Sequence, residues 1–390
     1  MKYLKNTPYL LKRELGILWG NSVLRAVFFG APVLYTLLLG YVYSTGKVSE
    51  LPIVVVDEDH SPMSARLTDM LDENETIHVS SVRATGTGLK EAMLEENAVL
   101  TVYIPEHFEA DILQRRYPEV LVDVNMANIL TANFATRAVQ VSLGTLNAGL
   151  EAEALRKSGV PYEEALKRFE PFKTTFLRTG NPSGNYMNFL WPGMLATILQ
   201  QVLLLAAAIS FAYEFETGRF ADEFVPKAPR AWYALFVKTL PYLAGSFLIA
   251  GFFILGHRLF HVPLSVQPWE LLFPLFLFSL AVLFLGTLVS IWIPNQLKAT
   301  ELLMVVATPS FVLSGYTWPI EQMPVYVRYL SEAIPLTPFL RVYRTVWVSG
   351  GSLADAASAV QSLGCMVLVF GLLSWVSLLY KYRSARTSKK

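Results

Sequence analysis

Long apolar stretches separated by short polar segments dominate the chain. A bilayer core of about 30 Å needs roughly 20 apolar residues per helix. Arg25 and Lys238 are the only charges within these stretches, and each lies within about two turns of a helix end, where a long side chain can reach the interface. The pattern predicts six transmembrane helices, at 22–43, 187–213, 231–256, 271–293, 302–319 and 356–380.

The segment between the first two stretches, residues 44–186, has a different pattern. Short β-branched runs alternate there with helical periodicity, which predicts an α/β domain. Ser61 or Ser64 can cap a helix that runs through about Leu71. The expected strands are 52–57, 76–80, 98–103 and 119–124, and the other expected helices are 88–96, 106–116 and one or two within 128–157.

The segment 314–345, which follows the fifth stretch, is apolar but rich in proline. Proline removes a backbone donor and breaks a continuous helix. Non-helical backbone is tolerated at membrane depth only where protein or water satisfies it. We therefore expect broken short helices that re-enter the membrane from the outer surface; an interfacial loop is the alternative.

Residues 1–21 carry apolar positions at helical spacing, with basic residues elsewhere. This is typical of an amphipathic helix at a membrane interface, although a simple basic flank of the first span gives a similar pattern. The stripe consists of Leu4, Leu11, Leu15 and Leu18. The stretch 22–43 is too long for the apolar region of a signal peptide, and no clear small-x-small site follows it, so we expect an uncleaved anchor.

Composition supports a membrane protein: 53% of the residues are hydrophobic and only 16% are charged. Residues 44–186 carry a net charge of −8 and the rest carries +9. The basic residues gather in both tails, including 381–390, and in the loop after the second span. Positively charged loops stay in the cytoplasm. We therefore expect cytoplasmic termini, an extracytoplasmic 44–186 and insertion in the inner (cytoplasmic) membrane; binding to nucleic acid through bulk positive charge is excluded.

Candidate chemistry is sparse. Asp57-Glu58-Asp59-His60 could hold a hard cation, but a solvated turn after a strand explains it better. Gly86-Thr87-Gly88 lacks the frame of a phosphate loop and fits the turn before a helix. The five histidines lack ligand spacing and the single cysteine, Cys365, excludes a disulfide scaffold. No catalytic residues and no metal site are expected, and no cofactor is expected to bind to this chain.

Charged and aromatic residues mark the cytoplasmic side. After the second span, Phe220 and Phe224 lie four residues apart among charges, as in a small helix that docks its apolar side in the groove of a partner; an ordinary connecting loop is the alternative. Lys238 and Glu301 both lie near cytoplasmic helix ends. They are candidates for an intramembrane ion pair, with independent snorkelling as the alternative.

The order of these features resembles the permease subunits of ABC-2 type exporters, in the subgroup with a large extracytoplasmic domain between the first and second spans. The resemblance covers essentially the whole chain. Its carriers are the run from Val54 to Ser61, Asn181-Pro182 and Trp191-Pro192-Gly193, and the re-entrant positions Ser314, Gly315, Pro319, Met323, Pro324, Ile334, Pro335, Leu336 and Thr337.

The resemblance implies a permease that dimerises, with itself or with a homologous neighbour, and engages an ABC ATPase that carries ATP and Mg. The segment after the second span would then be the coupling helix, with the N-terminal helix beside it. Phe215 and Arg219 depart from the Glu-Arg-Glu and Gly-Thr pattern of the family, so the contact with the ATPase would differ in detail. The implied coupling residues are Glu214, Glu216, Gly218, Arg219 and Phe220.

Apolar spans favour a lipophilic or amphipathic substrate, and the family suggests a periplasmic adaptor and an outer-membrane channel as further partners. A membrane-anchored sensor with an extracytoplasmic ligand-binding domain is the alternative function. It explains the insert but not five further spans. An intramembrane enzyme would need a nucleophile, a metal triad or an acid/base pair, and the spans offer none.

Overall fold

The computed structural model describes residues 2–86, 89–159, 161, 177, 180–264 and 267–387. The chain divides into two compact units, one formed by Lys47–Leu177 and the other by Met1–Gly46 together with Arg178–Lys390. Thr87 and Gly88 of the predicted glycine turn and residues 388–390 of the basic tail lie outside the described residues.

The Lys47–Leu177 unit is an α/β domain built on a four-stranded sheet of order β2-β1-β3-β4. β1 pairs in parallel with β2 and β3, and β3 pairs antiparallel with β4. The alternation of strands and helices predicted from the sequence is present. The elements are β1 (Leu51–Asp57), α4 (Pro62–Asp72), β2 (Ile77–Arg83), α5 (Leu89–Glu95), β3 (Leu100–Ile104), α6 (Phe108–Leu113), β4 (Leu121–Val124) and α7 (Ile129–Lys157).

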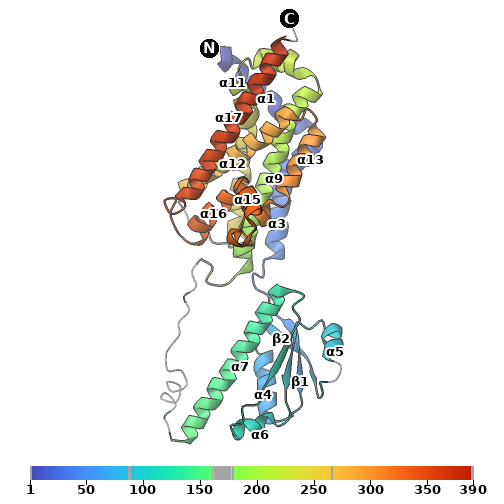
Figure 1. The fold of residues 1–390 in the computed structure, drawn as a ribbon, viewed down its shortest axis with the longest axis vertical. Coiled ribbons are helices and arrows are strands. Elements are labelled where there is room, and N and C mark those ends of the chain that lie inside the picture. Colours follow the sequence, from blue (N-terminus) through green and yellow to red (C-terminus); the bar gives the residue numbers. More distant parts are fainter. Residues whose placement is uncertain are drawn as a thin grey trace. The chain divides into compact units, whose positions relative to one another are not determined.

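The core of this unit lies on one face of the sheet. Ile53 and Val55 of β1 point to that face and pack with Leu67 of α4 and with Val139 of α7. Figure 1 shows α7 and α5 on different sides of the sheet. Ser61 caps α4 through a reciprocal pair of hydrogen bonds with Ser64, as the sequence predicted.

The other unit is a helical bundle. Five of its helical stretches are long and apolar enough to cross a membrane, within the part of the chain that the structure describes: Ser22–Val42, Tyr186–Glu216, Ala231–Leu259, Trp269–Trp292 and Ala357–Thr387. The first consists of α2 (Ser22–Arg25), the π-helix η1 (Ala26–Gly30) and α3 (Ala31–Val42), and the others correspond to α9 (Tyr186–Glu216), α11 (Ala231–Leu259), α12 (Pro268–Trp292) and α17 (Ala357–Thr387).

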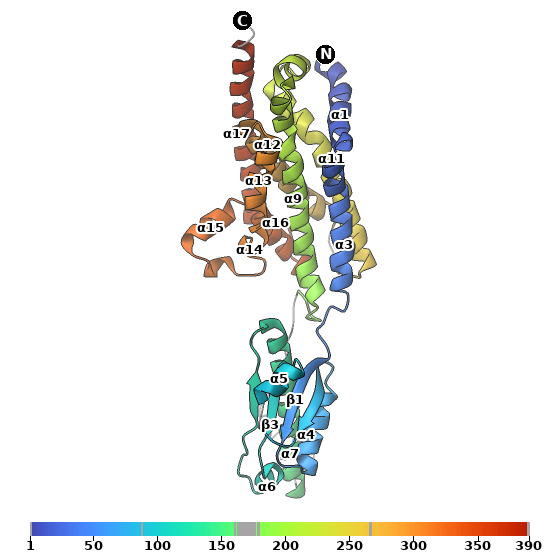
Figure 2. The same cartoon turned by 90° about the vertical axis from the view of Figure 1, so that its right-hand side faces the viewer.

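The bundle is centred on α9. Figure 2 shows α9 between α3 and α11 on one side and α12, α13 and α17 on the other. The apolar part of α9 is 83% buried, compared with 22% for α17. Both termini lie at the end of this unit where α9 finishes (Figure 2).

The fifth predicted span, 302–319, is not a single helix. α13 (Gln296–Ala307) ends before Pro309, and the four-residue α14 (Ser310–Leu313) follows. Pro309 has no backbone N–H and crowds the carbonyl four residues earlier, which interrupts the helix there.

The other described helices of this unit are shorter than its long apolar helices. α1 (Lys2–Gly20) precedes the first apolar stretch. η2 (Phe220–Phe224) and α10 (Val225–Lys227) join α9 to α11. The proline-rich segment contains the 3-10 helix η3 (Ile320–Gln322), α15 (Val325–Glu332), α16 (Leu336–Val342) and the π-helix η4 (Tyr343–Val348).

Candidate functional site: a buried ionic cluster beneath the coupling segment

Three helices bring four charged side chains together at the end of the bundle that holds the termini. Arg13 and Glu14 come from α1, Glu214 from the last turn of α9, and Lys238 from α11. We call these four residues the ionic cluster. Glu14, Glu214 and Lys238 are almost completely buried.

Glu214 lies at the centre of the ionic cluster. Its two carboxylate oxygens accept hydrogen bonds from both terminal nitrogens of Arg13, at 2.5 and 2.8 Å. The Lys238 ammonium donates to the same carboxylate at 2.6 Å. A bidentate Arg–carboxylate pair is among the stronger hydrogen-bonded arrangements in proteins, so Glu214 fixes α9 to both α1 and α11.

Lys238 makes further contacts that explain how an ammonium can be buried. It lies 2.9 Å from the Glu14 carboxylate and donates to the backbone oxygen of Ser210 at 2.9 Å. Its nitrogen also lies 5.0 Å from the ring centroid of Phe224. Three oxygen partners and an aromatic face replace the water that the ammonium loses.

The ionic cluster contains two positive and two negative formal charges, but its carboxylates are unequally satisfied. Glu14 Oε2 is buried and has no hydrogen-bond partner among the residues that the structure describes. Burial raises the pKa of Glu14, and the nearby Lys238 only partly opposes that shift. Glu14 is therefore the member of the cluster that takes up a proton most readily.

Sequence reasoning missed Arg13 and Glu14 as members of a site. Arg13 belongs to the basic residues that were placed outside the apolar stripe of Leu4, Leu11, Leu15 and Leu18. In the structure, Leu18 of that stripe and Leu10 are buried on either side of Glu14, while Leu15 is 42% exposed. Leu10, Glu14 and Leu18 are four residues apart, so they lie on one side of the helix. The charged residue between the two leucines makes this buried side hard to recognise in the sequence.

The predicted ion pair between Lys238 and Glu301 is wrong. Lys238 binds Glu14 and Glu214 instead, whereas Glu301 is exposed on α13. Both residues are near helix ends, but a pair also requires the two helices to present the side chains to each other. That arrangement is set by the packing of the bundle.

The predicted coupling segment lies directly over the ionic cluster. Glu216 is exposed and accepts hydrogen bonds from Asn295 and from the backbone and side chain of Gln296, which ties α9 to the start of α13. Gly218 has a φ of +71°, a left-handed conformation that favours glycine and turns the chain after α9. Arg219 is exposed and pairs with Glu223 at 3.9 Å.

The docking hypothesis expected Phe220 and Phe224 to present an apolar surface to a partner. This expectation is wrong, because both rings are buried in this chain. They are 5% and 1% exposed and pack among Leu10, Phe211 and Tyr382 of the same chain. The π-helical turn η2 directs both rings inward. Charged and polar side chains of this segment, including Arg219, Asp222 and Glu223, form its exposed surface.

The proline-rich segment is held to α9 by a buried amide. Gln200 is 1% exposed; it donates to Ser310 at 2.9 Å and accepts from the backbone N–H of Leu336 at 3.1 Å. Ser331 donates to the carbonyl of Leu313 at 2.6 Å and lies 3.3 Å from the Thr337 hydroxyl. Backbone groups released by the broken helices therefore have partners within the protein.

The other residues singled out in this segment shape its turns. Gly315 has a φ of +78°, and a side chain there would collide with Ile320. Pro324 and Pro335 immediately precede α15 and α16. Ser314, Met323 and Thr337 are buried, and Pro319 precedes η3.

The acidic turn of the α/β domain is occupied by its own backbone. Asp57 accepts from the backbone N–H groups of Asp59 and His60 and from the Ser64 hydroxyl. Glu58 accepts from Gly86 N–H and from the Tyr103 hydroxyl. These carboxylates stabilise the loops around the end of β1. The motif is a turn after a strand, as predicted, but Asp57 is buried rather than solvated.

Comparison with known proteins identifies the class. Residues 23–379 match the ABC-2 family transporter proteins, so the chain belongs to that family. It is 22% identical over 349 residues to the probable multidrug ABC transporter permease YbhR of Escherichia coli (strain K12), which covers 88% of this chain and 90% of the relative.

Two further relatives are consistent with this assignment. The probable multidrug ABC transporter permease YbhS of Escherichia coli (strain K12) is 26% identical over 203 residues, which is 50% of this chain and 52% of the relative. The ABC transporter G family member 20 of Dictyostelium discoideum is 23% identical over 332 residues, or 82% and 42% of the two chains. The chain is therefore a multi-pass membrane protein and the permease subunit of an ABC transporter.

Proposed function

We propose that this permease exports a lipophilic or amphipathic substrate and is driven by a separate ATPase that binds ATP and Mg and contacts the segment 217–223. The observation that carries the proposal is the ionic cluster behind this segment. It joins α1, α9 and α11 through buried, charge-assisted hydrogen bonds. A force on the segment is therefore transmitted to three helices together rather than to one.

The exposed surface of the segment supports a polar contact with the ATPase. Arg219 and Glu223 are about half exposed, with relative side-chain accessibilities of 49% and 51%. Exposed charges at an interface determine the register and the choice of partner more than the binding energy. Phe220 and Phe224 then act from inside, as the packed support of the segment.

We propose six membrane crossings, with α13 and α14 together forming the fifth and residues 314–345 re-entering from the outer side. α13 and α14 are close enough in sequence to form one bent crossing. Cytoplasmic termini and an extracytoplasmic Lys47–Leu177 unit follow from the positive-inside rule. The membrane would be the inner membrane of the cell.

A second permease, either a copy of this chain or a homologue, would cover the exposed side of α13. Glu301 is exposed there, next to the exposed apolar side chains of Leu302 and Val305. A carboxylate within a membrane span is costly in contact with lipid and ordinarily faces protein or water. A periplasmic adaptor and an outer-membrane channel are further candidate partners on the side of the α/β domain.

The contact with the ATPase can be tested by reversing one charge. Arg219→Glu places two carboxylates side by side and should lower co-purification of the ATPase by on the order of tenfold. ATPase stimulation by reconstituted permease should fall in parallel. Arg328→Glu is the matched control, because Arg328 is exposed on α15, on the opposite side in the proposed topology.

Unchanged ATPase recovery with Arg219→Glu, or an equal loss with Arg328→Glu, would remove the segment from the coupling role. Orientation is tested by cysteine labelling after the exposed Cys365 is replaced by Ser. Tyr117→Cys, at a position that is 89% exposed, should react with a membrane-impermeant reagent only from outside the cell. Reaction only from the cytoplasm would invert the topology.

A further inference from the structure

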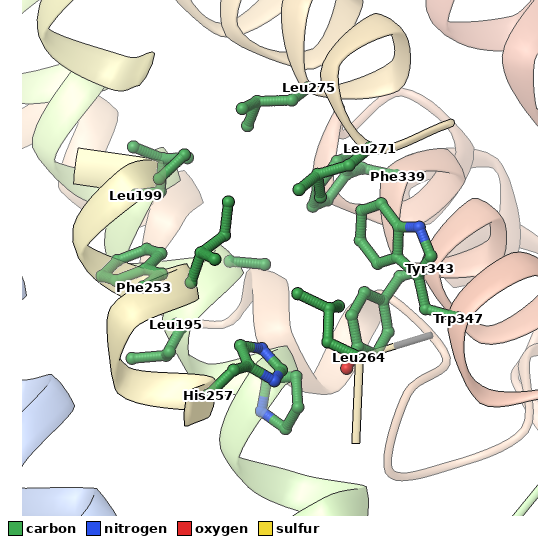
Figure 3. A pocket seen from close by; sticks show the side chains of 14 residues that line it. Leu195, Leu199, Phe253, His257, Leu264, Leu271, Leu275, Phe339, Tyr343 and Trp347 are labelled. Carbon is green, nitrogen blue, oxygen red and sulfur yellow. The ribbon is translucent and has the colours of Figure 1, made fainter. Parts of the chain in front are cut away.

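A cavity lies within the helical unit, away from the ionic cluster. Figure 3 shows side chains from α9 (Leu195, Leu199), α11 (Phe253, His257) and η4 (Tyr343, Trp347) around it. The volume of the cavity, measured as the space open to the centre of a water molecule, is about 60 Å³. One water needs roughly 10–15 Å³ by this measure, so the cavity has room for one small ring.

The described residues that line the cavity include no Asp, Glu, Lys or Arg. A charged guest would therefore lose its hydration without gaining a counter-charge, which is costly. His257 does not supply one readily, because its ring is 7% exposed and its Nδ1 lies 3.4 Å from the Val262 carbonyl oxygen. A carbonyl can only accept, so the Nδ1 carries the proton in this contact.

Two polar groups belong to the aromatic wall of the cavity. Trp347 Nε1 is buried and has no hydrogen-bond partner among the described residues. Tyr343 adds a hydroxyl, and this residue is 6% exposed. Figure 3 shows its oxygen directed to the space beside Leu264, on the wall opposite His257. A hydroxyl beside apolar side chains gains a hydrogen bond from a guest that presents an acceptor, which is favourable.

The backbone around Tyr343 is irregular in a way that serves the cavity. η4 is a π-helix, a rare conformation that occurs frequently at functional sites. It brings the ring centroids of Tyr343 and Trp347 to a distance of 4.5 Å, in an edge-to-face contact. Phe339 of α16 packs 5.9 Å from Trp347 and closes the aromatic wall.

We propose that this cavity binds an uncharged, lipophilic molecule through a small aromatic or aliphatic group, with an oxygen acceptor on that group meeting the Tyr343 hydroxyl. The cavity is largely apolar, and small-molecule sites in proteins are lined mainly by apolar and aromatic side chains with a few polar groups. The inference deepens the proposed function, because it names the part of the permease that selects the substrate. Binding itself requires neither ATP nor the ATPase.

The test uses purified full-length permease in lipid nanodiscs, without ATPase, and follows ¹⁹F line broadening. The probes are 4-fluoroacetophenone, its acceptor-free counterpart 4-fluorocumene and the cation 4-fluorobenzylammonium. Saturable broadening of the ketone is expected, with affinity at least about tenfold above that of the cation. Equal saturable binding of the cation would overturn the inference.

Tyr343→Phe removes the hydroxyl and keeps the ring. It should weaken binding of the ketone by about 3- to 10-fold, the effect of one hydrogen bond, and leave 4-fluorocumene unchanged. Tyr326→Phe is the matched control, because Tyr326 is 88% exposed on α15. Equal ketone affinity in wild type and Tyr343→Phe would show that the hydroxyl does not recognise the guest.

Ala250→Leu places extra atoms in the cavity and should abolish saturable binding of both neutral probes. Leu275→Phe, from α12, fills the same space from another wall and serves where Ala250→Leu does not fold. Binding that survives a folded filling variant would overturn the inference, since partition into the nanodisc lipid would then explain it. Arg219→Glu tests the ATPase contact in a separate experiment. Either proposal can therefore fail while the other holds, and the two failures are distinguished.

Discussion

The two units of the molecule hold their buried carboxylates in opposite ways. In the α/β domain, Asp57 binds backbone N–H groups two and three residues away and a hydroxyl seven residues away. In the helical unit, Glu214 binds side chains from helices that are far apart in the sequence, on Arg13 and Lys238.

This difference determines what each carboxylate controls. The bonds of Asp57 shape a turn that the nearby sequence already favours, so losing one of them affects a single loop. The bonds of Glu214 neutralise two cations, and their loss leaves charges buried without a partner. Local carboxylates stabilise a turn, whereas the ionic cluster makes three helices interdependent.

The largest effect is expected for Glu214→Gln. Removing this charge leaves Arg13 and Lys238 with only the incompletely satisfied Glu14, and breaking a buried pair in this way costs about 3–5 kcal/mol. The thermal unfolding midpoint of the purified permease should fall strongly. Glu223→Gln is the control, because Glu223 is about half exposed in the same region; equal stability of the two variants would contradict the central role of Glu214.

Asp57→Asn should have an intermediate effect. The amide can keep the contacts with the two backbone N–H groups, but it loses the charge-assisted bond with Ser64. We expect a loss of about 1–2 kcal/mol. Hydrogen exchange should show greater opening in α4 and none in α9. An equal increase of hydrogen exchange in both units would show that the bonds of Asp57 stabilise more than this one turn.

Glu14→Gln should be tolerated, with a change below about 1 kcal/mol, because Lys238 keeps Glu214 and the Ser210 carbonyl as partners. A folded-state pKa above the unfolded value of about 4.3 means that the folded protein holds this proton more tightly. The stability of wild type relative to Glu14→Gln should therefore fall as the pH rises from the unfolded pKa through the folded one. A pH-independent difference between the two unfolding midpoints would contradict the raised pKa.

The smallest effect concerns Tyr103. Its hydroxyl donates to the Glu58 carboxylate, which raises the pKa of Tyr103 above its ordinary value of about 10. Glu58→Gln should lower that pKa, so the phenol should ionise at lower pH in a ¹³C-tyrosine NMR titration. Tyr117, which is 89% exposed, serves as the internal reference. An unchanged Tyr103 titration would show that the bond is not maintained in solution.

Much of the fold follows from local patterns. The β-branched run of β1, the Ser61 cap and the turn after Asp57 are encoded within a few residues, and the strands and helices of the α/β domain follow the predicted order. Apolar length identified five stretches that can cross a membrane. The fifth of the six predicted spans, 302–319, was expected to be one helix because hydropathy does not register the break at Pro309.

The candidate site was only partly accessible from the sequence. Lys238 and Glu214 stood out as charged residues near or within apolar stretches. Nothing in the sequence specified that Lys238 meets Glu14 rather than Glu301, or that Tyr343 and His257 line one cavity. Such contacts depend on which faces the helices present to each other. Helices that are far apart in the sequence, such as α1 and α11, carry no local signal of that orientation.

The sequence by itself determined a membrane protein with an inserted α/β domain, because apolar length, charge asymmetry and turn chemistry are properties of neighbouring residues; the permease class came from the resemblance of the whole chain to a family. Only the tertiary structure decided that Phe220 and Phe224 turn inward and that α1 buries Glu14 between two leucines. The physical reason is that a buried charge is tolerated only where groups from other helices pair with it. The packing of the whole bundle decides whether those groups lie close enough.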